Sequence, residues 1–140
     1  MSRNALRQEL IGSLKDVYEL KAFATLEDLL QGEFRVLQYL AAHQSEAVYP
    51  SDLSRELRLS RSRITGALTS LRQKNCVEMH HSQTDRRRVQ VTITQEGLGV
   101  LMEKLDRMAR YFDHMIAGLG DADTTELIRL IRRCVEVMQE

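Results

Sequence analysis

Apolar side chains recur every three or four positions along the first part of the chain, which predicts a series of helices. The longest stripe predicts a helix over residues 3–22, and a shorter helical piece covers residues 26–30. A third helix is expected over residues 33–43. The stripe of the first helix consists of Leu6, Leu10, Leu14 and Val17.

A change of pattern before Pro50 predicts an extended segment and then a short helix. The residue before a proline is pushed out of the helical region, so residues 47–49 are expected to be extended. Ser51 is the candidate N-cap of a short helix that runs through Leu57.

The next helix is predicted over residues 61–74, with Ser60 as its candidate N-cap. Asn75 tolerates the left-handed conformation that ends many helices, so we expect the helix to end there. The inner face of this helix is expected to consist of Ile64, Leu68 and Leu71.

After Asn75 the pattern changes to period two, which predicts two β-strands. Apolar and polar residues alternate over residues 77–82 and again, with β-branched side chains, over residues 89–94. The segment between them is polar and basic. The pattern therefore predicts an antiparallel hairpin with a cationic tip.

Two helices are predicted after the hairpin. Thr94 is the candidate N-cap of the first, whose apolar stripe has heptad spacing over residues 98–115. This stripe could be a seam between subunits or part of the intramolecular core, and we expect a mixture of both. Gly118 and Gly120 are expected to interrupt the helix, and Asp123 with Glu126 resembles a capping box that opens the last one.

The composition is consistent with a single domain, residues 1–140, that is mainly α with a small β-hairpin (α+β). The chain has one Pro and seven Gly, and 43% of its residues are hydrophobic, so it can form a packed core with few tight turns. Charged residues near the N-terminus argue against a signal peptide, and no apolar run is long enough for a membrane span. We expect a cytoplasmic protein without a membrane partner.

The charges cancel overall, but they are distributed unevenly. The net charge is −2 over residues 1–50, +5 over residues 51–90 and −3 over residues 91–140. A basic segment between acidic ones is typical of a surface that faces phosphates, although chance clustering on a solvated face explains it equally well.

The middle of the chain has the element order of a winged helix-turn-helix: a short helix, a tight turn, a second helix and a hairpin with a basic tip. Arginine can read guanine edges, Ser and Thr reach bases or phosphates, and the N–H groups behind a serine cap suit a phosphate. The candidate DNA-binding residues are Ser60, Arg61, Ser62, Arg63, Thr65, Gly66, Thr69, Arg86, Arg87 and Arg88.

Two segments of the chain resemble the multiple antibiotic resistance regulator (MarR) family of transcription factors. The first is LRLSRSRITGALTSL at residues 57–71, and the second is DRRRVQVTITQEG at residues 85–97. The second is similar to the family's wing signature, an Asp-x-Arg followed by a β-branched strand that ends in Ile-Thr and a later Gly. The order and spacing match, and the resemblance extends over the whole chain.

The resemblance implies a homodimer that binds one half of a near-palindromic operator with each winged region. Residues 33–95 would bind double-stranded DNA, and residues 1–30 and 96–140 would form the helical dimerisation region. Asp85 would pair with Arg87 and order the wing. Gly66 stands where many relatives have a long side chain, which would shift base readout to Arg61, Arg63 or Thr69.

From these observations we expect a sequence-specific transcriptional regulator, a repressor that a small-molecule effector releases from DNA; the effector-binding residues are not identified. No cofactor, metal site or enzymatic activity is expected, because the motifs of common catalytic sites are absent. One alternative is a redox-responsive regulator that acts through Cys76, whereas Cys134 is expected to be a small buried apolar residue. The other is a protein-interaction module that does not bind DNA.

Overall fold

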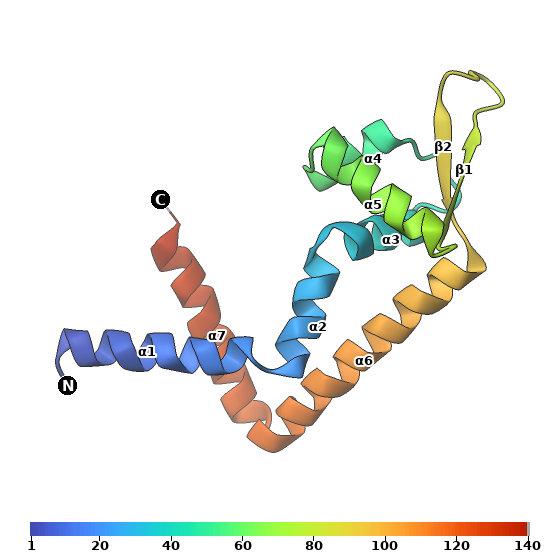
Figure 1. Ribbon diagram of the computed structural model, residues 1–140. Coiled ribbons are helices and arrows are strands. Elements are labelled where there is room, and N and C mark those ends of the chain that lie inside the picture. Colours follow the sequence, from blue (N-terminus) through green and yellow to red (C-terminus); the bar gives the residue numbers. More distant parts are fainter. Residues whose placement is uncertain (140) are drawn as a thin grey trace.

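A computed structural model describes residues 1–139 and confirms the predicted fold class, mainly helical with one two-stranded antiparallel hairpin (Figure 1). The helices and strands are α1 (Arg3–Tyr18), α2 (Lys21–Leu30), α3 (Gly32–Ala42), α4 (Pro50–Leu57), α5 (Arg61–Gln73), β1 (Val77–His81), β2 (Val89–Ile93), α6 (Gln95–Leu119) and α7 (Asp121–Met138).

The core lies where α3 meets α5, the hairpin and the first half of α6. Side chains from these elements are buried together because each element turns its apolar stripe inward. Val36 and Leu37 of α3 are fully buried, and so is Leu53 of α4. The inner face predicted for α5 is confirmed, and Ala67 joins it. The rest of the core is Leu29, Leu40, Val48, Cys76, Val77, Val91 and Leu101.

The hairpin is registered so that Met79 lies opposite Val91. The N–H of Val91 also donates to the Val48 carbonyl at 2.8 Å, so the segment before α4 runs along the outer edge of β2. The extended conformation predicted for residues 47–49 is therefore used to join the hairpin to the rest of the winged region.

Several predicted helix boundaries are wrong. The second helix begins at Lys21 instead of residue 26, and Gly118 does not interrupt its helix, because α6 continues to Leu119. The first helix ends at Tyr18 instead of residue 22. The helix α4 begins at Pro50, whose fixed φ suits a first helical residue, so Tyr49 and not Ser51 is its N-cap. The last helix begins at Asp121 directly after Gly120, which has a φ of 85°, and therefore Asp123 is not a cap.

The other predicted caps are confirmed. The Ser60 side chain accepts a hydrogen bond from the Arg63 N–H at 3.2 Å, and Thr94 accepts one from the Gly97 N–H at 3.0 Å. Asn75 has a φ of 61°, the left-handed conformation expected after α5. Local sequence signals thus fix both ends of the turn between α5 and the hairpin.

The helix α6 connects two different environments. In its first half Leu101 is buried, and Leu105 and Met108 pack against the core. In its second half Ile116 and Leu119 are exposed. Figure 1 shows α6 leading away from the winged region to α7, with α1 also extending away from the core. The heptad stripe is therefore core at its start and only half-buried at Phe112 and Met115, near its end.

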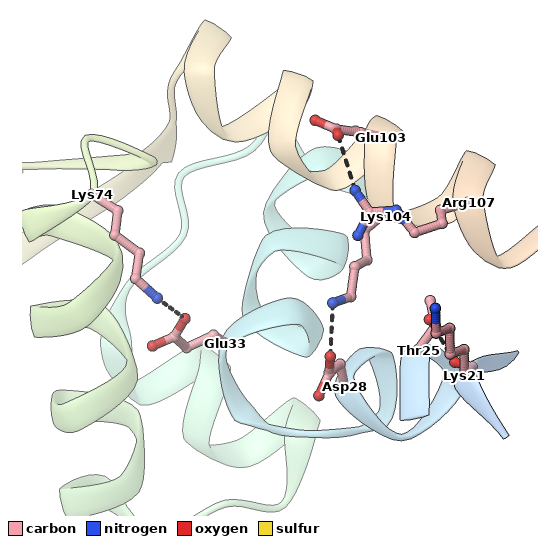
Figure 2. Close-up of polar contacts among 8 residues, drawn as sticks. All are labelled: Lys21, Thr25, Asp28, Glu33, Lys74, Glu103, Lys104 and Arg107. Carbon is pink, nitrogen blue, oxygen red and sulfur yellow. Dashed lines mark hydrogen bonds and ion pairs between the residues drawn. The ribbon is translucent and has the colours of Figure 1, made fainter. Parts of the chain in front are cut away.

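Two ion pairs link neighbouring helices around this core (Figure 2). Lys104 of α6 lies 2.7 Å from a carboxylate oxygen of Asp28 in α2, and its ammonium group is 4.9 Å from the centre of the Phe34 ring. Lys74 at the end of α5 lies 2.9 Å from a carboxylate oxygen of Glu33 in α3. The second pair holds the C-terminal end of α5 against α3.

Gly97 allows the start of α6 to approach the end of α5 closely. A Cβ at this position would overlap the Cys76 carbonyl oxygen and lie 2.9 Å from Cγ1 of Ile93. We predict that Gly97→Ala lowers the free energy of unfolding by about 1–3 kcal/mol, because backbone must move to make room. Urea denaturation followed by circular dichroism measures this change.

The matched control is Gly99→Ala on the same helix, where a Cβ would meet nothing within 4 Å. Alanine is the better helix former, so this variant should be as stable as the unsubstituted protein or more stable by up to about 1 kcal/mol. Equal stability of the two variants would show that the close approach at Gly97 has no energetic consequence.

The Glu33–Lys74 pair predicts a pH-dependent stability. Burial raises the pKa of Glu33, but the hydrogen bonds from Lys74 and Ser70 and the Lys74 charge outweigh it, so the pKa lies below its ordinary value. A lowered carboxyl pKa stabilises the folded state above the unfolded pKa, and this contribution disappears as pH falls through the folded pKa.

We therefore predict that Glu33→Gln is less stable than the unsubstituted protein at pH 7, by about 0.2–1 kcal/mol for a pair so exposed to solvent. The difference should begin to shrink as the pH falls below the ordinary carboxyl pKa of about 4.3, and it should disappear once the pH lies below the lowered pKa of the folded state. Urea denaturation between pH 3 and 7 tests this, and Lys74→Met should reproduce the same pH profile. A difference independent of pH in both variants would contradict the assignment.

Candidate nucleic-acid interface

The helix α5 has one buried and one exposed face. Its buried residues hold it against α3 and α4, and this packing leaves the opposite face in solvent. The exposed face contains all six of the helix residues predicted to bind DNA, and none of them is used in the core. These residues are Arg61, Ser62, Arg63, Thr65, Gly66 and Thr69.

The N-terminus of α5 presents polar groups to the same side. Ser60 caps the helix, and its hydroxyl lies 3.3 Å from the hydroxyl of Ser62. The first N–H groups of a helix have no partner within the helix and carry the positive end of its dipole. This end of α5 therefore has the electrostatic character of an anion-binding site, reinforced by Arg61 and Arg63.

The tip of the hairpin is ordered by Asp85. Its Oδ1 atom accepts a hydrogen bond from the Arg87 N–H at 3.0 Å and lies 3.5 Å from the Arg87 side-chain Nε. The Asp85 carbonyl accepts a further bond from the Arg88 N–H at 3.0 Å. The Arg87 side chain remains 94% exposed, so the turn is fixed while its cation stays in solvent.

Arg88 is placed differently from the other two wing arginines. Its guanidinium carbon lies 3.6 Å from the centre of the Tyr49 ring, at the base of the wing. Sequence reasoning grouped Arg88 with Arg86 and Arg87 because the three are consecutive. Only the tertiary structure shows that the Tyr49 ring lies under the guanidinium group of Arg88.

A groove of about 540 Å³ runs between the outer face of α5 and the hairpin. Thr65, Thr69 and Arg72 form its helical wall, at a spacing of four and three residues, and Met79 contributes from β1. Arg72 is not among the residues that the sequence predicted to bind DNA, although its spacing from Thr69 places it on the same face. The remaining lining residues are Pro50, Leu68 and Gln73.

Several arginines of α5 and of the wing tip have no acidic partner within residues 1–139. Within residues 1–139, no carboxylate lies within 4.0 Å of Arg61, Arg63, Arg72 or Arg86. Unpaired cations on one face produce a positive potential that attracts a polyanion. The basic segment found in the sequence is thus a basic surface in the folded protein.

The cysteines occupy different environments. Cys76 is 2% exposed, and burial raises the pKa of its thiol, which disfavours the reactive thiolate. This environment argues against the redox alternative at Cys76. Cys134 was expected to be buried, but in the single chain it is exposed on α7.

Residues 1–139 contain no group of three or more His, Cys, Asp or Glu side chains arranged to hold a metal ion. None of the helices in this part combines the length and the apolar character that crossing a membrane requires.

Comparisons with known proteins support a winged-helix regulator. A model of the MarR family matches residues 27–88. The chain is 28% identical over 103 residues to the HTH-type transcriptional repressor YetL of Bacillus subtilis (strain 168); the match covers 74% of this chain and 62% of YetL, less than two thirds of its length.

Solved structures have the same fold. The YusO protein of Bacillus subtilis superposes with a TM-score of 0.76 at 18% identity, covering 97% of this chain and 99% of YusO. MepR, a transcription regulator of the Staphylococcus aureus multidrug efflux pump MepA, has a TM-score of 0.66 at 17% identity, covering 99% of this chain and all of MepR. Other MepR structures hold an oligodeoxyribonucleotide or ethidium bromide. The chain is therefore similar to the MarR family over residues 27–88 and shares the winged-helix fold of these solved structures.

Proposed function

We propose that the protein is a sequence-specific transcriptional repressor that binds a near-palindromic operator as a homodimer. In this proposal α5 enters the major groove and the wing follows the adjacent backbone or minor groove. Residues 33–95 form the DNA-binding region, and residues 1–30 and 96–140 form the dimerisation region.

The observation that carries the proposal is the exposed cationic face of α5 beside the wing. Arg61 and Arg63 occupy the first turn of the helix, the part that contacts base edges in helix-turn-helix proteins. Thr65 and Thr69 continue the same face toward the groove. Arg86 and Arg87 extend the basic surface to the wing tip, where they would meet phosphates.

The homodimer is supported by apolar faces on α1 and α7 that have no cover in the single chain. Neither helix has a buried residue among those described. Contiguous apolar surface of this kind marks an interface, and a second copy of the same helices would bury it symmetrically. The exposed apolar residues are Leu6, Leu10, Ile11, Leu14, Val17, Leu127, Ile128, Leu130, Ile131, Val135, Val137 and Met138.

Release by a small-molecule effector follows from the same architecture. The helix α6 connects the winged region to α7, so its tilt would set the distance between the two recognition helices of a dimer. An effector changes DNA affinity only if it binds the two spacings with different affinities. The ethidium complex of MepR, which has the same fold, supports a ligand of this kind.

A protein-interaction module without DNA binding remains the competing function. It shares the fold but requires no cationic face on α5. Three arginines of that face, Arg61, Arg63 and Arg72, have no acidic partner among the described residues, and they favour DNA because cations gathered on one face attract a polyanion.

We predict that Arg61→Ala weakens operator binding by about 1–3 kcal/mol, which corresponds to an increase of about 5- to 160-fold in Kd, through loss of a base contact. Arg87→Ala should weaken binding to specific and scrambled DNA alike and lower the salt dependence by about one unit of slope, as expected for one phosphate contact. Fluorescence anisotropy with the protein's own upstream promoter DNA, at several salt concentrations, measures both effects.

The control is Arg110→Ala in α6, an exposed arginine paired with Asp106 and outside the candidate interface. It should bind with the affinity of the unsubstituted protein. Wild-type affinity in both the Arg61 and Arg87 variants would refute the proposed interface, and equal weak binding of promoter and scrambled DNA would favour the interaction module.

The dimer proposal predicts that charges on the exposed apolar faces separate the subunits. Leu10→Asp combined with Ile131→Asp places a carboxylate on α1 and on α7, where burial would be costly. Light scattering after gel filtration should give a mass near 16.2 kDa instead of about twice that value. The operator affinity of this variant should also be lower, because a monomer contacts one half-site whereas a dimer contacts two.

Val100→Asp is the matched control, since Val100 is exposed to a similar degree but lies near the start of α6 beside the winged region. This variant should keep the mass of the unsubstituted protein. A monomeric mass for the unsubstituted protein itself would contradict the dimer.

A further inference from the structure

Tyr49 lies at the junction between α4 and the wing. It precedes Pro50 and is the N-cap of α4. Its ring lies under the guanidinium group of Arg88 at 3.6 Å, and its hydroxyl donates to the Ser82 Oγ at 3.4 Å. One side chain thus touches the two residues between which the chain forms the wing tip.

The backbone of Tyr49 is fixed to the helix-turn-helix. Its N–H donates to a carboxylate oxygen of Asp52 at 2.9 Å, and its carbonyl accepts the Asp52 N–H at 2.9 Å. The helix α4 packs in turn against α5. The position of the Tyr49 ring is therefore set by the elements that position the recognition helix.

The contacts of Tyr49 on the wing side are themselves ordered. Ser82 is 4% exposed, and its N–H donates to the Arg88 carbonyl at 2.9 Å, which closes the base of the tip loop. The Ser82 hydroxyl lies 3.0 Å from the hydroxyl of Thr84. Arg86 and Arg87 lie on the loop that these contacts close.

A two-stranded hairpin has little stability of its own and needs an anchor to hold one orientation. We propose that Tyr49 is a positioning residue for DNA binding, which anchors Arg88 and Ser82 and so sets where Arg86 and Arg87 lie relative to α5. This inference rests on the proposed function. In this inference Arg88 anchors the wing and does not contact a phosphate. Tyr49 would raise the affinity for DNA because it holds the wing in its binding orientation before DNA arrives.

The test is a set of substitutions measured by anisotropy on promoter DNA. Tyr49→Leu removes the ring and should weaken binding about fivefold, the ratio that corresponds to a cation–π contact of moderate strength. Tyr49→Phe keeps the ring under Arg88 and removes only the hydroxyl contact with Ser82, so it should weaken binding less than Tyr49→Leu does. In an Arg88→Gln background the further loss from Tyr49→Leu should be smaller than in the unsubstituted protein, and in an Arg86→Ala/Arg87→Ala background there should be none.

An equal loss from Tyr49→Leu in all three backgrounds would overturn the inference, because the residue would then act through α4 alone. Wild-type affinity of Tyr49→Leu would overturn it as well and leave the proposed function intact. If the unsubstituted protein does not bind DNA, the proposed function and this inference both fail.

A readout without DNA separates anchoring of the wing from general loss of structure. In the free protein, Tyr49→Leu should speed tryptic cleavage after Arg86 and Arg87 several-fold, as followed by mass spectrometry, because the loop opens more often. Cleavage elsewhere in the chain, and unfolding in urea, should change little. Unchanged cleavage at the wing would refute the anchor.

Discussion

The burial of one face of α5 against α3 and α4 is the contact on which the rest of the structure depends. Ile64, Leu68 and Leu71 are almost completely removed from water, and burial of each such side chain contributes about 1.5–3 kcal/mol. Because these residues recur at helical spacing, the opposite face is forced into solvent with its arginines and threonines. The same packing therefore stabilises the fold and presents the cationic surface.

The wing depends on this core at two places. Gly97 lets α6 start directly beside the Cys76 carbonyl, so the second strand can pass without a linker into the helix that leads away from the core. At the other end, Val48 pairs with Val91, and Tyr49 lies under Arg88. The hairpin is thus held at its open end and at the base of its tip, while the tip itself stays in solvent.

The winged region and the helices α1 and α7 differ in how far their apolar side chains are buried. The winged region has a packed apolar core, which it shares with α2 and the first half of α6, whereas α1 and α7 have no buried residue among those described. In the proposed dimer, association would bury the apolar faces of α1 and α7 and so couple assembly to the placement of the two proposed DNA-binding surfaces. The α2–α6 ion pair of Asp28 and Lys104 lies between these two parts of the chain.

The sequence by itself determined the helix order, the hairpin, the caps at Ser60 and Thr94 and the exposed face of α5, because periodicity and capping are local properties. Helix ends at Pro50 and Gly120 were less well determined, since several residues there can serve as caps. Only the tertiary structure decided that Tyr49 meets Arg88, that Met79 of β1 and Arg72 of α5 line the same groove and that Cys76 is buried. These facts depend on contacts between residues far apart in the chain, and neither spacing nor composition contains that information.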